Sequence, residues 1–310
     1  ASELATLIAG QYLFGMGCAP ALLAAMVLIA RYFPPERFAF MSGLVLSLGG
    51  LGMLLTSTPL AWVIEGWSWR AGFWILTVLS AMSWLVVLLC DDGQREMHAQ
   101  TSTTLAAMLR GLGSILVQPW TAGICGLVVT TYAAFMALRG LWLGPLLSER
   151  FGFTLLELGN TALAFSVAGV AGPLLAGRLD PGGPARRLLI LACTLAYAML
   201  FLAHAIGISL RIDIALLMVN ALLSGFITLQ YADVRAAYPP ELTGRALSVF
   251  TMAMFGGVAA VQWLSGVVAT QAPRLGLDPL FAALVTVSLT LILGATAFAL
   301  LPKPPYLRSH

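Results

Sequence analysis

An arginine inside a long apolar segment is the residue with the clearest chemical potential in this sequence. Arg139 lies well within the apolar stretch 120–147. A charge in apolar surroundings is expensive, so it should face the protein interior or a water-filled cavity. Tyr132, Phe135 and Trp142 share its face of an α-helix, because the four residues recur at i, i+3, i+7 and i+10. A guanidinium among aromatic rings suits a carboxylate or another planar anion. The alternative is an arginine that pairs with backbone carbonyls or extends to a polar boundary.

Uncharged polar side chains in other apolar segments are the next candidates. Gln11, Asn220 and Gln262 each stand in such a segment, as do Asn160 and Gln230. Amides of this kind most often form hydrogen bonds between helices, and lining a binding cavity is the other role open to them. His204 lies near the end of its apolar segment, where we expect it at the polar boundary and not in a proton relay.

Two acidic–basic pairs lie at the ends of apolar segments. Arg178 and Asp180 form one pair, and Asp233 and Arg235 form the other. Residues two positions apart do not face each other on a helix. We therefore predict that these four side chains pair with neighbouring loops and hold one end of the structure closed. Solvated charges without that role are the alternative.

The composition excludes a water-soluble domain. Hydrophobic residues make up 60% of the 310 residues, charged residues make up 9%, and the mean hydropathy is +0.93. Soluble domains carry about a quarter charged residues, so lipid is the expected solvent for most of this chain. The formal net charge of +3 is too small to indicate nucleic acid as a partner.

The apolar segments predict an all-α polytopic membrane protein. A spanning helix needs roughly 20 apolar residues, and nine segments qualify: about 4–30, 38–64, 71–90, 120–147, 155–177, 187–207, 212–232, 246–270 and 279–301. Residues 1–92 then hold three helices, and residues 119–302 hold six. Residues 93–118 form a linker with a short surface helix at about 105–116, and residues 303–310 form a tail.

Loop charges predict the orientation of the chain. Lys and Arg accumulate on the cytoplasmic side of membranes. One set of loops holds eleven of the 16 basic residues, and the other set holds Arg70, Arg150, Arg211 and Arg274. This bias predicts a cytoplasmic linker and a cytoplasmic C-terminus.

A short repeat suggests that the chain contains two related halves. Tyr32-Phe33-Pro34-Pro35-Glu36-Arg37 and Tyr238-Pro239-Pro240-Glu241 are both aromatic-Pro-Pro-Glu turns between two helices, and Arg245 follows the second. Three predicted helices of the second block precede the helix that leads into its turn, whereas none does so in the first block. If the halves are equivalent, three further helices are expected ahead of the first segment. Chance similarity of two Pro-rich loops is the alternative.

The cysteines do not indicate a metal site or a disulfide framework. Cys18, Cys90, Cys125 and Cys193 lie in or at the ends of apolar runs, and no two share a short loop. We interpret them as packing residues and expect no metal and no cofactor.

Three motifs together resemble those of major facilitator superfamily (MFS) transporters. The stretch 10–17 resembles the opening of the family's fourth helix, with Gln11 where Arg is usual. The stretch 66–73 resembles the Gly-Trp-Arg entry to helix six. The stretch 177–187 resembles the basic turn between helices eight and nine, with Pro181 where an Arg is common. Thr56 and Ser57 stand where antiporters of the family carry Gly-Pro, so that branch is not indicated.

The resemblance implies an MFS-like bundle in which the nine helices correspond to helices four to twelve of twelve. It implies that Arg139, Tyr132 and Trp142 lie on a cavity-lining helix, and that Gln11, Asn220 and Gln262 lie on others. The expected function is secondary transport of a small organic solute, with an anion weakly favoured, by alternating access. The expected location is the cell membrane, such as a bacterial inner membrane.

Other functions remain as alternatives. Coupling to a proton and uniport are both open, because no Asp or Glu lies in the middle of a predicted helix. A membrane interaction protein without transport activity, or a truncated relic of a transporter, is the second reading. An enzyme is not expected, because paired catalytic groups at membrane depth are not visible.

Overall fold

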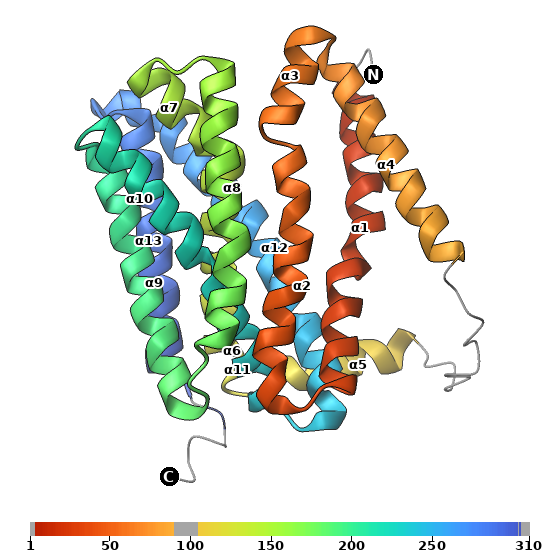
Figure 1. Cartoon of the computed structure of the whole chain (residues 1–310). Coiled ribbons are helices and arrows are strands. Elements are labelled where there is room, and N and C mark those ends of the chain that lie inside the picture. The colour runs from red at the N-terminus through yellow and green to blue at the C-terminus, as the bar shows by residue number, and fades with distance from the viewer. Residues whose placement is uncertain (1–3, 90–104, 303, 305–310) are drawn as a thin grey trace.

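The computed structural model describes residues 4–89, 105–302 and 304, and these are helical with no strand (Figure 1). The first block contains α1 (Leu4–Tyr32), α2 (Pro35–Leu55), α3 (Thr58–Gly66) and α4 (Trp69–Leu89). After the gap come α5 (Leu105–Leu116), α6 (Thr121–Ala137), η1 (Leu138–Trp142), α7 (Leu143–Phe151), α8 (Leu155–Arg178), α9 (Gly183–Ile206), α10 (Leu210–Leu223), η2 (Ser224–Phe226), α11 (Ile227–Ala237), α12 (Pro240–Gln271), η3 (Ala272–Leu275) and α13 (Pro279–Leu300).

The prediction of nine membrane spans is confirmed within the described part of the chain. Several spans are not single α-helices. The second consists of α2 and α3, the fourth of α6, η1 and α7, and the seventh of α10, η2 and α11. The eighth begins at Pro240, six residues ahead of its predicted start at 246, because the Pro-Pro turn directly starts the helix. The predicted helix at 105–116 is α5, whereas residues 90–104 of the predicted linker lie outside the described residues.

Local sequence signals set several helix ends. Thr154 and Glu157 form a capping box at the start of α8, in which the Thr154 backbone N–H donates to the Glu157 carboxylate at 2.9 Å. Asp278 accepts the Phe281 N–H at 2.7 Å and starts α13. Gly207 ends α9 in the left-handed conformation, with φ of 66°, which glycine adopts at little cost.

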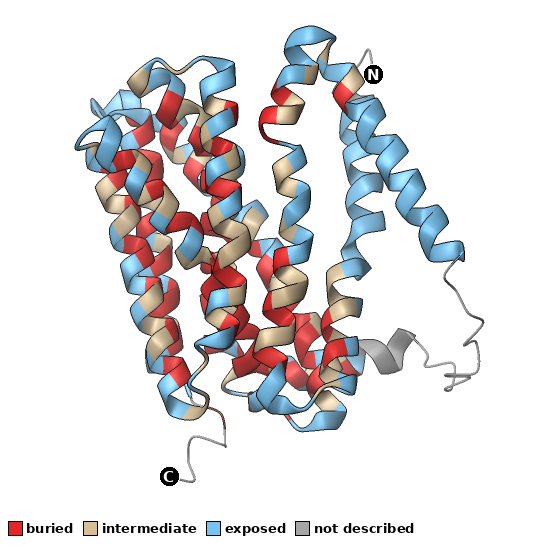
Figure 2. Ribbon diagram, in the orientation of Figure 1, coloured by how far each residue is buried: buried red, intermediate tan, exposed pale blue. Residues whose placement is uncertain are grey.

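The helices after the linker form the more closely packed block. Figure 2 shows buried residues concentrated in α6 and α8–α13, whereas α4 is almost wholly exposed. The first block joins the second mainly through α2, which packs along α8. A Cβ at Gly177 of α8 would lie 2.6 Å from the Ala39 carbonyl oxygen of α2. Small residues thus bring the two backbones together, as is usual between membrane helices. The division of the chain into two halves at the linker stays a prediction.

The two Pro-Pro turns of the sequence repeat lie at the same end of the bundle, and α5 and the last turn of α13 lie there too (Figure 1). We call this the basic end. Arg235, at the end of α11, donates hydrogen bonds to the carbonyls of Ala30, Phe33 and Pro34, at 3.0, 2.8 and 3.2 Å. The end of α11, just ahead of the second turn, is therefore bonded directly to the first turn.

Candidate functional site

A cavity of about 210 Å³ lies between α2 of the first block and α6 and α8 of the second. Tyr132 and Phe135 of α6 form one wall, and Met53 of α2 and Ser166 of α8 lie on the others. Phe135 stacks on Phe165 with ring centroids 5.6 Å apart. The lining is mostly apolar with few polar groups, a combination typical of pockets for small molecules.

Arg139 lies on η1, which is a π-helical turn in the middle of the fourth span. The Leu143 N–H bonds to the Leu138 carbonyl, five residues back, and this spacing defines the π-turn. Single π-turns inside α-helices occur frequently at functional sites. The extra residue in the turn changes the direction of the side chains that follow it.

Two serine hydroxyls from different blocks hold the Arg139 guanidinium. Nη2 donates to the Ser57 Oγ at 3.0 Å, and Nε lies 3.4 Å from the Ser166 Oγ. The serine oxygens are 3.5 Å apart. Ser57 lies at the break between α2 and α3, and Ser166 lies on the cavity wall. Arg139 therefore bridges the first and second blocks next to the cavity.

The charge of Arg139 has no counterion in the described part of the chain. Its hydrogen-bond partners are neutral hydroxyls, and the side chain is only partly exposed. Hydrogen bonds to neutral groups satisfy the N–H donors but leave the positive charge uncompensated. An anion in the adjoining cavity would provide the missing compensation.

The π-turn separates Trp142 from the other residues predicted to share its face. The Trp142 indole N–H donates to the Ser265 Oγ of α12 at 3.1 Å, and the ring is buried there. Gln262, also on α12, donates to the Met136 carbonyl at 3.2 Å, directly before the π-turn. The expectation of a single face for Tyr132, Phe135, Arg139 and Trp142 is wrong, because it assumed an uninterrupted α-helical period.

Gln11 and Asn220 lie apart from this group. Gln11 is on an exposed stretch of α1 and forms no hydrogen bond with another described residue. Asn220 is fully buried on α10, and neither polar atom of its amide has a hydrogen-bond partner among the described residues. Neither residue lines the 210 Å³ cavity. Asn160 and Gln230 bond to other helices, through Thr58 at 2.9 Å and Thr131 at 3.1 Å.

The four predicted gating residues divide by charge. The arginines reach the first block: Arg235 binds the Pro-Pro turn, and the Arg178 guanidinium lies 5.5 Å from the Phe40 ring centroid. The carboxylates pair within the second block. Asp180 binds Arg186 at 2.7 Å, and Asp233 lies 3.6 Å from Arg187.

Tyr238, in the turn between α11 and α12, adds a neutral contact at the basic end. Its hydroxyl lies 2.5 Å from the Thr121 Oγ1 at the start of α6. Burial raises the pKa of Tyr238 to about 12, so the phenol remains protonated at neutral pH.

His204 does not lie at a polar boundary as expected. The imidazole is fully buried, and its Nδ1 is 3.2 Å from the Asp213 Oδ1. Arg150 donates to the carbonyls of His204 and Ala205, at 2.6 and 3.2 Å. The expectation was wrong because the short turn between α9 and α10 folds Asp213 directly onto the histidine, and the buried carboxylate gives it a polar partner.

Ser57 and Ser166 were not among the site residues predicted from the sequence. Serine is common in membrane helices, where its hydroxyl usually bonds to the carbonyl one turn back. Both serines do so, Ser57 to Met53 at 2.8 Å and Ser166 to Ala162 at 2.7 Å. The one available signal was the Thr56-Ser57 pair, which stands where antiporters of the family carry Gly-Pro.

Comparison with known proteins identifies the class. The family model of the Major Facilitator Superfamily matches residues 1–262. The chain belongs to this superfamily, and it is a multi-pass membrane protein of a transporter family. No curated protein is significantly similar to it.

Proposed function

We propose that the protein is a secondary transporter that moves a small organic anion across the membrane by alternating access. The observation that carries the proposal is the uncompensated guanidinium of Arg139 between the two blocks, beside a cavity with aromatic walls. A substrate carboxylate would accept hydrogen bonds from Arg139, and Tyr132 and Phe135 would contact its apolar part. The proposal does not include a coupling ion.

Substrate binding would also change the contact between the blocks. Arg139 holds Ser57 of the first block and Ser166 of the second. A carboxylate is a stronger acceptor than a hydroxyl, so it would draw the guanidinium away from Ser57. Release of Ser57 would weaken the contact between the two blocks on one side of the cavity, while Arg235 and Arg178 hold the basic end closed. In this proposal, the exchange of Ser57 for the substrate carboxylate couples binding to alternating access.

The roles of the remaining predicted residues follow from their positions. Trp142 and Gln262 would hold the π-turn in place and thereby aim Arg139. Gln11 and Asn220 have no role in the proposed contact. We also propose that the basic end faces the cytoplasm in a cell membrane, because most basic loop residues are at that end.

Ligand-dependent thermal stability of the purified protein tests the proposal. We would screen small carboxylates, each against its uncharged amide, which keeps the shape but removes the charge. A ligand at 100 times its Kd stabilises a protein by about 2.7 kcal/mol. We expect some carboxylates to raise the unfolding temperature and their amides not to do so.

Variants make the test specific to the site. Arg139→Gln should abolish the stabilisation, whereas Arg70→Gln should retain it, because Arg70 is exposed and lies on the Trp69 ring at 4.4 Å. Full carboxylate binding by Arg139→Gln would refute the proposed contact. If no solute stabilised the protein and a specific membrane protein co-purified with it, a membrane interaction protein without transport activity would be the better reading.

A further inference from the structure

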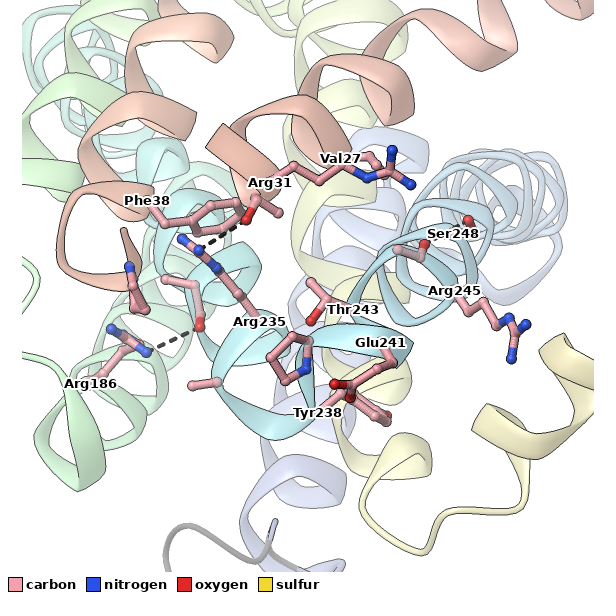
Figure 3. Close-up of a pocket in the computed structure, with 16 residues that line it drawn as sticks. Val27, Arg31, Phe38, Arg186, Arg235, Tyr238, Glu241, Thr243, Arg245 and Ser248 are labelled. Carbon is pink, nitrogen blue, oxygen red and sulfur yellow. Dashed lines mark hydrogen bonds between the residues drawn. The ribbon is translucent and has the colours of Figure 1, made fainter. Parts of the chain in front are cut away.

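A second, larger cavity of about 730 Å³ opens at the basic end, between α1 and α2 on one side and α11 and α12 on the other. Figure 3 shows Arg31 and Arg245 on one side of it, and Arg186 and Arg235 on the other. Glu241 is the single carboxylate in this lining. The cavity is distinct from the smaller one beside Arg139, with which it shares no lining residue.

The four arginines differ in whether their positive charge is already paired. Arg186 is neutralised by Asp180, which it contacts at 2.7 Å through both Nε and Nη2. Arg235 donates to backbone carbonyls, and these do not cancel its charge. The lining therefore carries more positive than negative charge even after the ion pair is discounted.

Arg31 and Arg245 are the two cations free to bind a ligand. Both are exposed, and neither forms a hydrogen bond or an ion pair with another described residue. Arg31 lies in the last turn of α1 in the first block, and Arg245 is on α12 of the second. The Arg245 side chain lies against Gly111 of α5, where a Cβ would meet its Nε at 2.9 Å. The Arg245 side chain therefore extends toward α5 at the edge of the cavity (Figure 3).

The backbone adds positive potential at the same place. The N-termini of α2 and α12, at Pro35 and Pro240, both lie on the cavity lining. The helix dipole favours an anion at such ends, and Glu36 and Glu241 in the two first turns offset part of this potential. The two helix starts supplement the arginines, and both derive from the repeated Pro-Pro turn.

We propose that this cavity binds a phosphate group, and that the bound phosphate joins Arg31 of the first block to Arg245 of the second. Two guanidinium groups are the usual partners of a phosphate, because each can donate two parallel hydrogen bonds. A cavity of this size also accommodates the organic part of a phosphorylated molecule or of a lipid headgroup. Binding would hold the basic end closed, next to the contact that Arg235 makes with Ala30, Phe33 and Pro34. The proposal does not depend on the identity of the transported solute.

The test measures the unfolding temperature of the purified full chain with two phosphate sources. In one arm the protein is in neutral detergent, and inorganic pyrophosphate is titrated at constant ionic strength. In the other arm the protein is in nanodiscs of phosphatidylcholine, with or without phosphatidylglycerol. Stabilisation in the first arm assigns the site to a soluble phosphate compound, and stabilisation in the second alone assigns it to a lipid headgroup.

Variants decide whether the effect comes from this cavity. In the arm that stabilises the wild type, Arg31→Gln and Arg245→Gln should each weaken the effect, and the double variant should bind at least tenfold more weakly. Arg37→Gln is the matched control, since Arg37 is exposed at the same end but does not line the cavity. Arg139→Gln should also bind normally, which separates this site from the substrate site. Stabilisation in neither arm, or equal binding by the double variant and Arg37→Gln, would overturn the proposal.

Discussion

Two adjacent glycines of α12 allow a test of how closely α6 packs against this helix. Gly257 is buried against α6, and a Cβ there would lie 2.5 Å from the Val129 Cα, whereas ordinary contacts begin at 3.4 Å. The obstacle is backbone, so α6 and α12 would have to separate by roughly 1 Å in a close-packed interface. Gly256 is exposed, and a Cβ there would have no atom within 4 Å.

The adjacent position allows the packing cost to be isolated. Replacing glycine by alanine inside a helix stabilises it by about 0.5–1 kcal/mol through backbone entropy. This gain is common to Gly256→Ala and Gly257→Ala and cancels between them. The difference is the cost of overpacking, about 1–3 kcal/mol. A change of 1 kcal/mol shifts the unfolding temperature by about 2–4 °C in chains of 150–250 residues, so we expect Gly257→Ala to unfold roughly 5 °C below Gly256→Ala.

The assay is thermal unfolding in detergent, followed by tryptophan fluorescence at one fixed scan rate. The scan rate must be constant because irreversible unfolding makes the midpoint depend on it. Equal midpoints for the two variants would refute the close approach of α6 and α12. A Gly257→Ala protein that does not fold at all would agree with it, provided that Gly256→Ala folds.

Two further predictions concern the buried pair and the basic end. In a double-mutant cycle, Asp213→Asn and His204→Leu should each destabilise the protein and couple by about 1 kcal/mol, within the range measured for polar pairs in membranes; additive effects would refute the contact between the two side chains. Arg235→Gln should open the basic end, because it removes the hydrogen bonds to the first Pro-Pro turn, and should raise thiol labelling of Val27→Cys, which lines the larger cavity. Arg37→Gln is the control, and unchanged labelling would show that Arg235 does not hold the end closed.

The membrane spans could be predicted from the sequence because their signal is local. A run of apolar residues long enough to cross a bilayer must be helical, since only a helix satisfies its own backbone there. Proline and glycine then mark several ends, as Pro240 does for α12 and Gly207 for α9. Even α5 was predictable from a short apolar stretch within a polar region.

The arrangement of the site could be predicted only in part. The cost of a charge among apolar residues identified Arg139, because that cost does not depend on neighbours. Its partners could not be derived, because Ser57 and Ser166 come from different spans and meet only through the packing of α2 along α8. The π-turn was also missed. No residue type is specific for it, and the i+10 position of Trp142 holds only for regular α-helix.

The burial of His204 was missed for the same reason, because it depends on a contact between two different helices. The sequence showed a histidine near one helix end and an aspartate near the next helix start. Which side of each helix faces the other is decided by the turn between them, where Gly207 adopts a positive φ. A side chain that looks peripheral along the chain can thereby become one of the most buried in the fold.

Because of the π-turn, the side chains before and after it in the fourth span do not follow one continuous α-helical rotation. An α-helix advances about 100° per residue, so one extra residue in η1 sets α7 out of phase with α6 by about that angle. Such a turn can shift along a helix by exchanging one carbonyl acceptor for the next, without a break in the chain of hydrogen bonds. A shift by one position would swing the Arg139 side chain around the helix axis and away from Ser57. Such a shift would act at the residue that carries the charge, and the hydrogen bond from Gln262 to the Met136 carbonyl would oppose it.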